Sequence, residues 1–187
     1  MIVLASASPR RRELLGSLGL SFEIQPAEGP ENTPASGDAC GAVRAIALGK
    51  ARQVAALRPE ALVIGADTVV ELDGRILGKP ADEAEARAML RALSGRTHRV
   101  CTGVAVIGGG EERTHAEVTH VRFRELSERE IAAYAASGEP LDKAGAYAAQ
   151  GKAALFVEGI EGDYFNVVGL PLCALGRMLE HFGVELI

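Results

Sequence analysis

Residues 61–77 read ALVIGADTVVELDGRIL, and this stretch carries the strongest fold signal in the chain. Its run of apolar and β-branched residues is typical of a buried strand. Asp73-Gly74 is a favoured two-residue turn, and it leads directly into the apolar pair Ile76-Leu77. The stretch therefore predicts a β-hairpin.

One acidic residue, Asp67, interrupts this otherwise apolar strand. An ionised carboxylate inside an apolar strand is costly unless it is paired, hydrogen-bonded or bound to a metal ion. Asp67 is therefore expected either to have a partner with a chemical role or, as the simpler alternative, to be satisfied by neighbouring backbone at a strand end. The small residues Gly65-Ala66 just before it indicate that a ligand approaches closely here.

Outside the hairpin, strand and helix patterns alternate along the chain. Strands are expected over 2–5, 98–107, 113–124, 153–160 and around 167–168, helices over 11–18, 38–57, 82–93, 127–137 and 171–182, and a long loop over 22–37. This alternation predicts an α/β protein with a single domain over residues 1–187, in which any smaller lobe comes from the middle third.

Composition narrows the classes of function. Apolar residues make up 48% of the 187 residues but aromatic residues only 4%, so the core must consist mainly of Ala, Val, Leu and Ile, as in α/β proteins. The net charge of −5 argues against a general nucleic-acid binder, so any anion site must be local. The N-terminus lacks an apolar segment of the length that targets or spans a membrane, and a cytoplasmic protein is expected.

The first constellation with chemical potential is Arg10-Arg11-Arg12, at the start of the first expected helix. Ser8 is the expected N-cap, and Pro9 occupies the first helical position. Cations face the positive end of the helix dipole there, which is unfavourable unless an anion offsets it. A phosphate site built from these guanidinium groups, the Ser8 hydroxyl and backbone N–H groups is one interpretation. A solvated basic turn is the other.

Other candidates are weak when each is taken alone. Lys79 lies in the turn Gly78-Lys79-Pro80, Lys50 on a helix, Glu31 in the long loop and Gln150 in a glycine-bounded turn. Residues 139–147 combine charged and small residues with little capacity to form a core, as binding loops do.

Taken together, these motifs identify a resemblance. The motifs on which the resemblance rests are Leu4 to Arg11, Gly65 to Val70, Gly78-Lys79-Pro80, Leu93-Ser94-Gly95, Asp142 to Tyr147, Gln150-Gly151 and Gly162 to Leu172. In this order and spacing the chain resembles, over nearly its whole length, the Maf proteins, which are small nucleoside-triphosphate pyrophosphatases.

The resemblance implies a fold and an activity. The implied fold is a long, mixed, twisted sheet flanked by helices, similar to inosine-triphosphate pyrophosphatases and with a central cleft. The implied reaction is metal-assisted hydrolysis between the α and β phosphates, in a protein that is commonly a homodimer. The residues resemble the dTTP and UTP branch more than the 7-methyl-GTP branch, and a nucleotide-binding regulator of septum formation without turnover is the alternative from another class.

The resemblance also implies roles for individual residues. Asp67 matches the proton acceptor, and Glu31 matches an acidic loop residue that would share a divalent ion, Mg²⁺ or Mn²⁺, with Asp67. Many relatives have paired acids just before Glu31, so in this chain a second metal-ligating carboxylate is either missing or replaced by Glu28. Lys50 and Lys79 match the motif lysines that would neutralise phosphate charge.

The remaining residues concern recognition of the substrate. Ser8 and Arg11 are expected to bind phosphate, whereas Arg10, Thr68 and Gln150 match the positions that the resemblance associates with choice of the base.

Overall fold

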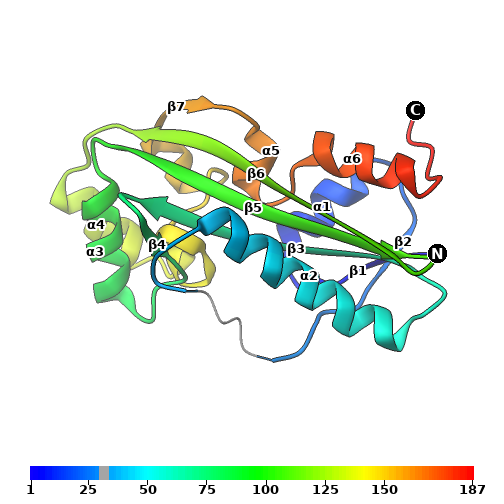
Figure 1. The fold of residues 1–187 in the computed structure, drawn as a ribbon. Helices are drawn as coiled ribbons and strands as arrows, with labels where there is room; N and C mark the ends of the chain where they lie inside the picture. The colour runs from blue at the N-terminus through cyan, green and yellow to red at the C-terminus, as the bar shows by residue number, and fades with distance from the viewer. Residues whose placement is uncertain (30–33) are drawn as a thin grey trace.

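The computed structural model describes residues 1–29 and 34–187. Figure 1 shows the path of the chain from the N-terminal strand to the C-terminal helix. The strands are β1 (Ile2–Leu4), β2 (Phe22–Ile24), β3 (Leu62–Leu72), β4 (Arg75–Leu77), β5 (Thr97–Gly108), β6 (Glu111–Phe123) and β7 (Val157–Glu161). The α-helices are α1 (Pro9–Gly16), α2 (Ala39–Leu57), α3 (Glu83–Leu93), α4 (Glu128–Ala135), α5 (Tyr164–Val168) and α6 (Leu172–His181), and the 3₁₀ turns are η1 (Glu139–Asp142), η2 (Ala144–Ala146) and η3 (Lys152–Phe156).

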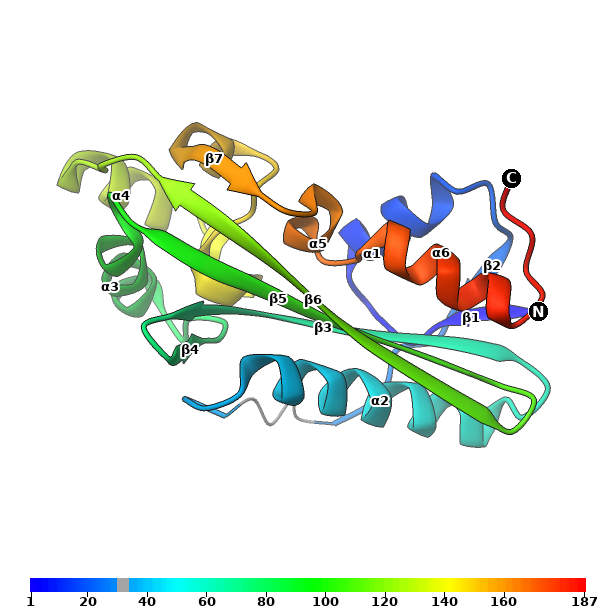
Figure 2. The same cartoon turned by 45° about the horizontal axis from the view of Figure 1, so that its top comes forward.

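Within the described residues, seven strands form one mixed sheet. Its order is β2-β1-β3-β5-β6-β7, and β4 pairs with β3. The strand β1 is parallel to β2 and β3, whereas the other pairings are antiparallel. The long strands β3, β5 and β6 twist across the molecule with helices on both faces (Figure 2). The expected long, mixed sheet flanked by helices is confirmed, and so is the hairpin at Asp73-Gly74.

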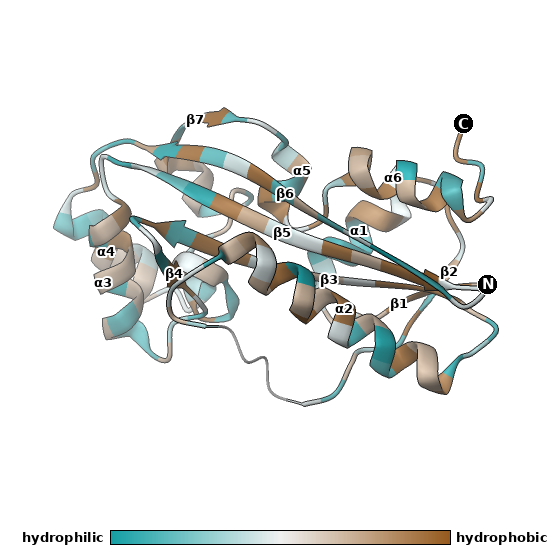
Figure 3. Cartoon of the chain, viewed as in Figure 1, coloured by the Kyte–Doolittle hydropathy of each residue, from teal (hydrophilic) through white to brown (hydrophobic). Residues whose placement is uncertain are grey.

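Alternate residues of the central strands supply two separate cores. On one face, Ile64 and Val104 pack with leucines of α1 and α6. On the other face, Val63 and Ala105 pack with alanines of α2. This alternation is the period of two that a strand buried on both faces requires. Figure 3 shows the apolar residues gathered along the central strands. None of the described helices combines the length and the apolar character needed to cross a membrane.

Helix α2 lies unusually close to the sheet because two strand residues opposite it are glycines. A Cβ atom on Gly65 would come within 2.3 Å of the carbonyl oxygen of Ala47, and one on Gly103 within 2.2 Å of that of Val43. No real Cβ atom tolerates such contacts, so the helix can occupy this position only over glycine. The interpretation of Gly65 as room for a ligand is therefore wrong, because the helix backbone fills that space.

The C-terminal half of β3, the N-terminal half of β5 and the C-terminal half of β6 pack with α3 and α4 into a third apolar cluster. Both helices begin as their sequences predict. The Asp82 side chain accepts a hydrogen bond from the N–H of Glu85, and Ser127 and Glu130 form a complete capping box.

Three local expectations were wrong. Residues 22–24 of the expected loop form the edge strand β2, because their backbone pairs with β1. The expected strand 153–160 is a 3₁₀ turn in its first half. The expected strand around Val167-Val168 is the helix α5, where Asp163 caps the N–H of Phe165 at 2.7 Å, so tertiary context overrides the β-branched pair.

The contact between α2 and the sheet predicts opposite effects for two Gly→Ala substitutions. Gly103→Ala should lower the free energy of unfolding by about 1–3 kcal/mol or more, because the new methyl group meets helix backbone that has no space to yield. Gly49→Ala on the exposed side of α2 should raise it by about 0.5–1 kcal/mol, because a Cβ there meets nothing within 4 Å and alanine favours the helix.

Urea denaturation followed by circular dichroism measures both variants against the parent protein. An unchanged midpoint for Gly103→Ala would contradict this account of the packing.

Candidate functional site

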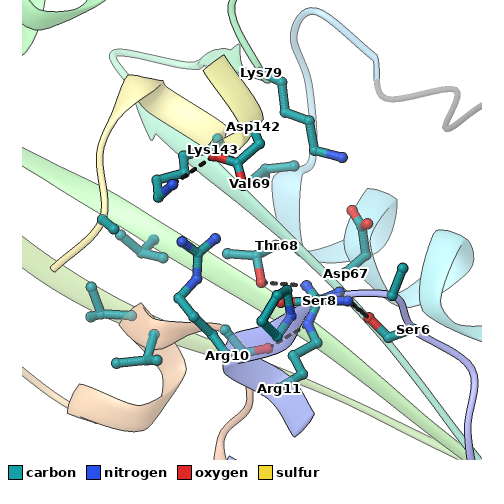
Figure 4. Close-up of a pocket in the computed structure, with 18 of the residues that line it drawn as sticks. Ser6, Ser8, Arg10, Arg11, Asp67, Thr68, Val69, Lys79, Asp142 and Lys143 are labelled. Atoms are coloured by element: carbon teal, nitrogen blue, oxygen red, sulfur yellow. Dashed lines mark hydrogen bonds and ion pairs between the residues drawn. The ribbon is translucent and has the colours of Figure 1, made fainter. Parts of the chain in front are cut away.

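A cavity of about 520 Å³ lies between α1, α2, the middle of β3 and residues 142–150. Figure 4 shows Arg10 and Arg11 entering it from α1, with Lys79, Asp142 and Lys143 across from them. The predicted site residues that line the cavity are Ser8, Arg10, Arg11, Lys50, Asp67, Thr68, Lys79 and Gln150. The remaining predicted residue, Glu31, lies outside the described residues.

Asp67 has the partner that its place in an apolar strand requires. Its Oδ1 atom lies 2.7 Å from Nζ of Lys50, and the two side chains are only 7% and 15% exposed. Lys50 reaches Asp67 because the close contact of α2 with the sheet brings this turn of the helix over the middle of β3. The pair places a carboxylate, with its charge balanced, in the wall of the cavity.

The basic turn at the start of α1 divides into two parts. Arg10 and Arg11 line the cavity, whereas Arg12 is exposed. Ser8 is the N-cap residue and lines the cavity, but its side chain makes no capping hydrogen bond. Pro9 occupies the first turn as predicted.

Protein acceptors hold Arg11 in one orientation. Its Nε donates to the carbonyl oxygen of Gly169 at 2.8 Å, Nη1 to Oγ of Ser6 at 3.2 Å and Nη2 to Oγ1 of Thr68 at 2.9 Å. Gly169 has φ of +123°, a conformation that favours glycine, and this directs its carbonyl toward α1. A guanidinium fixed in this way presents its charge to the cavity without first losing side-chain freedom.

The cavity is positive although the chain is acidic. Five cationic side chains and two carboxylates line it, whereas the whole chain has a net charge of −5. The cations are Arg10, Arg11, Lys50, Lys79 and Lys143, and the carboxylates are Asp67 and Asp142. Such a concentration of positive charge in a concave site attracts a polyanionic ligand.

The wall across from α1 is the segment 142–150, which shares residues 142–147 with the expected binding loop 139–147. The Tyr147 hydroxyl lies 2.7 Å from Nε2 of His98, which is fully enclosed on β5. Gly145 donates its N–H to the carbonyl oxygen of Gly78 at 3.0 Å, beside Lys79. These two bonds hold the segment that carries Gln150 against the sheet. Burial lowers the pKa of His98 to about 4, so its imidazole is neutral near pH 7.

The donor set suits a hard divalent ion that arrives with phosphate ligands. Residues 1–29 and 34–187 contain no group of three His, Cys, Asp or Glu side chains arranged to hold a metal ion. Mg²⁺ commonly uses one or two carboxylates and completes its coordination with water and substrate phosphates. Asp67 provides one such carboxylate in the cavity wall. Glu28, the alternative ligand, is exposed and does not line the cavity, and its backbone is hydrogen-bonded to Gln53.

Two buried residues behind the cavity were not predicted as part of the site. Thr102 on β5 and Asn166 on α5 are fully enclosed and extend the hydrogen bonds of Arg11 and Thr68 into the interior. Their sequence signal is faint, because a threonine is common in any strand and Asn166 lay in an expected loop or strand. A threonine at the same register on two neighbouring strands, Thr68 and Thr102, is the one pattern that points to this network.

Comparison with known proteins gives a match over almost the whole chain. The model of one protein family, described as Maf-like protein, matches residues 1–182. A dTTP/UTP pyrophosphatase of Moorella thermoacetica is 58% identical over 187 residues, which is 98% of this chain and 96% of the relative. A dTTP/UTP pyrophosphatase of Pelotomaculum thermopropionicum is 53% identical over 188 residues, covering 100% of this chain and 98% of the relative.

Among solved structures, the Staphylococcus aureus Ham1 protein is similar at 16% identity. The match covers 65% of this chain and 71% of that chain, with a TM-score of 0.49.

The burial of His98 predicts a pH-dependent stability. The unfolded chain takes up a proton on His98 near pH 6.5, whereas the folded protein resists protonation down to about pH 4. The free energy of unfolding should therefore fall as the pH drops from about 6.5 to 4, with about 3 kcal/mol attributable to this group. Urea titrations between pH 4 and 7 measure it, and His98→Gln should remove this part of the slope. The same slope in both proteins would show that His98 is not responsible.

Proposed function

Because this chain belongs to the Maf-like protein family, we propose that it is a pyrophosphatase that hydrolyses dTTP and UTP, and modified pyrimidine triphosphates related to them. Each reaction consumes one water molecule and releases a nucleoside monophosphate and pyrophosphate. The similarity to dTTP/UTP pyrophosphatases at 53–58% identity over essentially the full chain carries this proposal. The positive cavity supports it, because a triphosphate is the most highly charged part of such a substrate.

In the proposed complex, the triphosphate lies among the cations of the cavity. Arg10 and Arg11 contact it from the start of α1, and Lys79 contacts it from the opposite side. Arginine suits this role because its planar fork matches two phosphate oxygens, whereas lysine provides a point charge. The same groups stabilise the charge that develops on the departing pyrophosphate.

Asp67 is proposed to accept the proton of the attacking water. Two observations support this role. Asp67 is a buried carboxylate in the cavity wall, and its Oδ1 atom lies 2.7 Å from the ammonium group of Lys50. Lys50 holds the carboxylate in a single orientation, which a base must have before the substrate binds. Lys50 thus acts mainly on Asp67, in addition to any contact with phosphate.

A divalent ion, Mg²⁺ or Mn²⁺, is proposed to bind with the substrate. Asp67 would hold it from the protein side, and Glu31, which lies outside the described residues, is the proposed second carboxylate. When bound, such an ion supplies Lewis acidity and neutralises phosphate charge.

The base is proposed to contact Arg10, Thr68 and Gln150, the positions implied by the family resemblance. The same resemblance supports a homodimer in the cytoplasm, where the nucleotide pools are found.

The proposed activity predicts a ranking of substrates. With Mg²⁺ or Mn²⁺, the purified protein should release pyrophosphate from dTTP and UTP faster than from CTP, dATP, GTP or 7-methyl-GTP, measured as kcat/KM in a pyrophosphate assay. A preference for 7-methyl-GTP would replace the proposed substrate class. Release of pyrophosphate from none of the six, with nucleotide binding retained, would favour a binding protein instead.

The proposed role of Asp67 predicts a loss of turnover without loss of binding. Asp67→Asn keeps an oxygen for Lys50 but cannot accept a proton, so kcat for UTP should fall by on the order of 10²–10⁴-fold. The affinity for UTP, measured by calorimetry, should change little. Asp73→Asn on the exposed β3–β4 turn is the matched control and should retain the parent kcat. A kcat for Asp67→Asn equal to that of the control would refute the role of Asp67.

A further inference from the structure

A line of four hydrogen-bonding groups runs from the cavity into the interior of the protein. Nη2 of Arg11 donates to Oγ1 of Thr68 at 2.9 Å, as Figure 4 shows. Oγ1 of Thr68 lies 2.9 Å from Oγ1 of Thr102, its register partner on β5. Oγ1 of Thr102 lies 3.0 Å from the backbone carbonyl oxygen of Asn166. Thr68 lines the cavity, whereas Thr102 is fully buried.

The chemistry of these groups fixes the direction of each bond. A hydroxyl group has one hydrogen to donate and two lone pairs that accept, a carbonyl oxygen only accepts and a guanidinium only donates. Thr102 must therefore donate its hydrogen to Asn166, and none is left for Thr68. It follows that Thr68 donates its own hydrogen to Thr102.

This direction leaves Thr68 with a single function toward the cavity. Its hydrogen is committed to Thr102, and one lone pair is committed to Arg11. What remains is one lone pair, so Thr68 can accept a hydrogen bond from a ligand but cannot donate one. A threonine hydroxyl is normally able to do both, and here the interior of the protein removes that choice.

We propose that Thr102 and the Asn166 carbonyl make Thr68 an acceptor that selects bases with a hydrogen on the ring nitrogen N3, and that Thr102 is thereby a positioning residue for specificity. The inference rests on the proposed function. Uracil and thymine carry a hydrogen on N3, and this imide N–H donates to the free lone pair of Thr68. Cytosine has an unprotonated acceptor at N3, so two acceptors would face each other and the lone pair of Thr68 would lose its donor. A site that pairs with a substrate N–H rejects the analogue that lacks it far more strongly than a purely apolar pocket does.

The proposal predicts a change in selectivity when the Thr102 hydroxyl is removed. In Thr102→Val, no group behind Thr68 accepts its hydrogen, so the Thr68 hydroxyl can turn and donate to N3 of cytosine. The ratio of kcat/KM for UTP to that for CTP should then fall by roughly tenfold or more, with a gain for CTP as part of the change. Thr102→Ser keeps both the donor and the acceptor and should retain the parent ratio. Thr102→Ala serves in place of the valine variant if the latter does not fold.

Thr119→Val is the matched control. Thr119 is also fully buried and is hydrogen-bonded to the Asn166 side chain at 2.8 Å and to the backbone of Asp163, whereas none of the hydrogen bonds among the described residues joins it to Thr68. It should change the ratio by less than about threefold, well below the tenfold effect expected at Thr102.

Two outcomes overturn the inference while leaving the proposed function intact: hydrolysis of UTP by Thr102→Val with an unchanged ratio, or an equal change in Thr119→Val. Failure of the parent protein to hydrolyse any nucleotide would instead overturn the proposed function on which the inference rests.

Discussion

The contact of helix α2 with the sheet through Gly65 and Gly103 is the constraint on which the rest of the structure depends. A side chain of any size at either position would meet the helix backbone, so the helix and the two strands can approach this closely only because both residues are glycine. This close approach sets the distance between α2 and the sheet in the core that they form together. It also places Nζ of Lys50 at 2.7 Å from Oδ1 of Asp67. Packing and chemistry are thus joined at one place, because the contact that buries alanines of α2 also balances the charge of the buried carboxylate.

A second network ties the cavity to the C-terminal part of the chain. Asn166 is fully buried, and its side-chain N–H groups donate to the carbonyl oxygen of Val100 at 3.1 Å and to Oγ1 of Thr119 at 2.8 Å. Its backbone carbonyl oxygen accepts a hydrogen bond from Thr102. This short helix therefore fixes two central strands as well as the hydroxyl groups behind the cavity. Buried polar networks of this kind favour a single arrangement, because moving Asn166 would break three hydrogen bonds at once, although its side-chain oxygen has no partner in the described part of the chain.

Much of the fold could be predicted from local sequence. The hairpin at Asp73-Gly74 and the caps of α3 and α4 depend on nearby residues, and all three are confirmed. The strand β2 and the helix α5 could not be predicted in this way, because pairing with β1 and the buried contacts of Asn166 decide their conformation.

The site shows the same division. The family motifs predicted residues scattered from Ser8 to Gln150, and those that the structure describes line one cavity. Local patterns did not reveal what each contacts: Lys50 looked like a solvated lysine, Gly65 like space for a ligand, and Thr102 like an ordinary strand residue. These contacts join residues distant in sequence, and no local pattern specifies them.

The bond between Arg11 and the carbonyl of Gly169 spans 158 residues. On the ribosome, α1 is made long before Gly169, and closing so long a loop costs more entropy than forming a local contact. A nascent chain that ends before Gly169 therefore contains the carboxylate and the lysines of the cavity, together with Ser6 and Thr68, but lacks the acceptor for Nε of Arg11. The order of synthesis therefore delays completion of the cavity until the segment around Gly169 has been made.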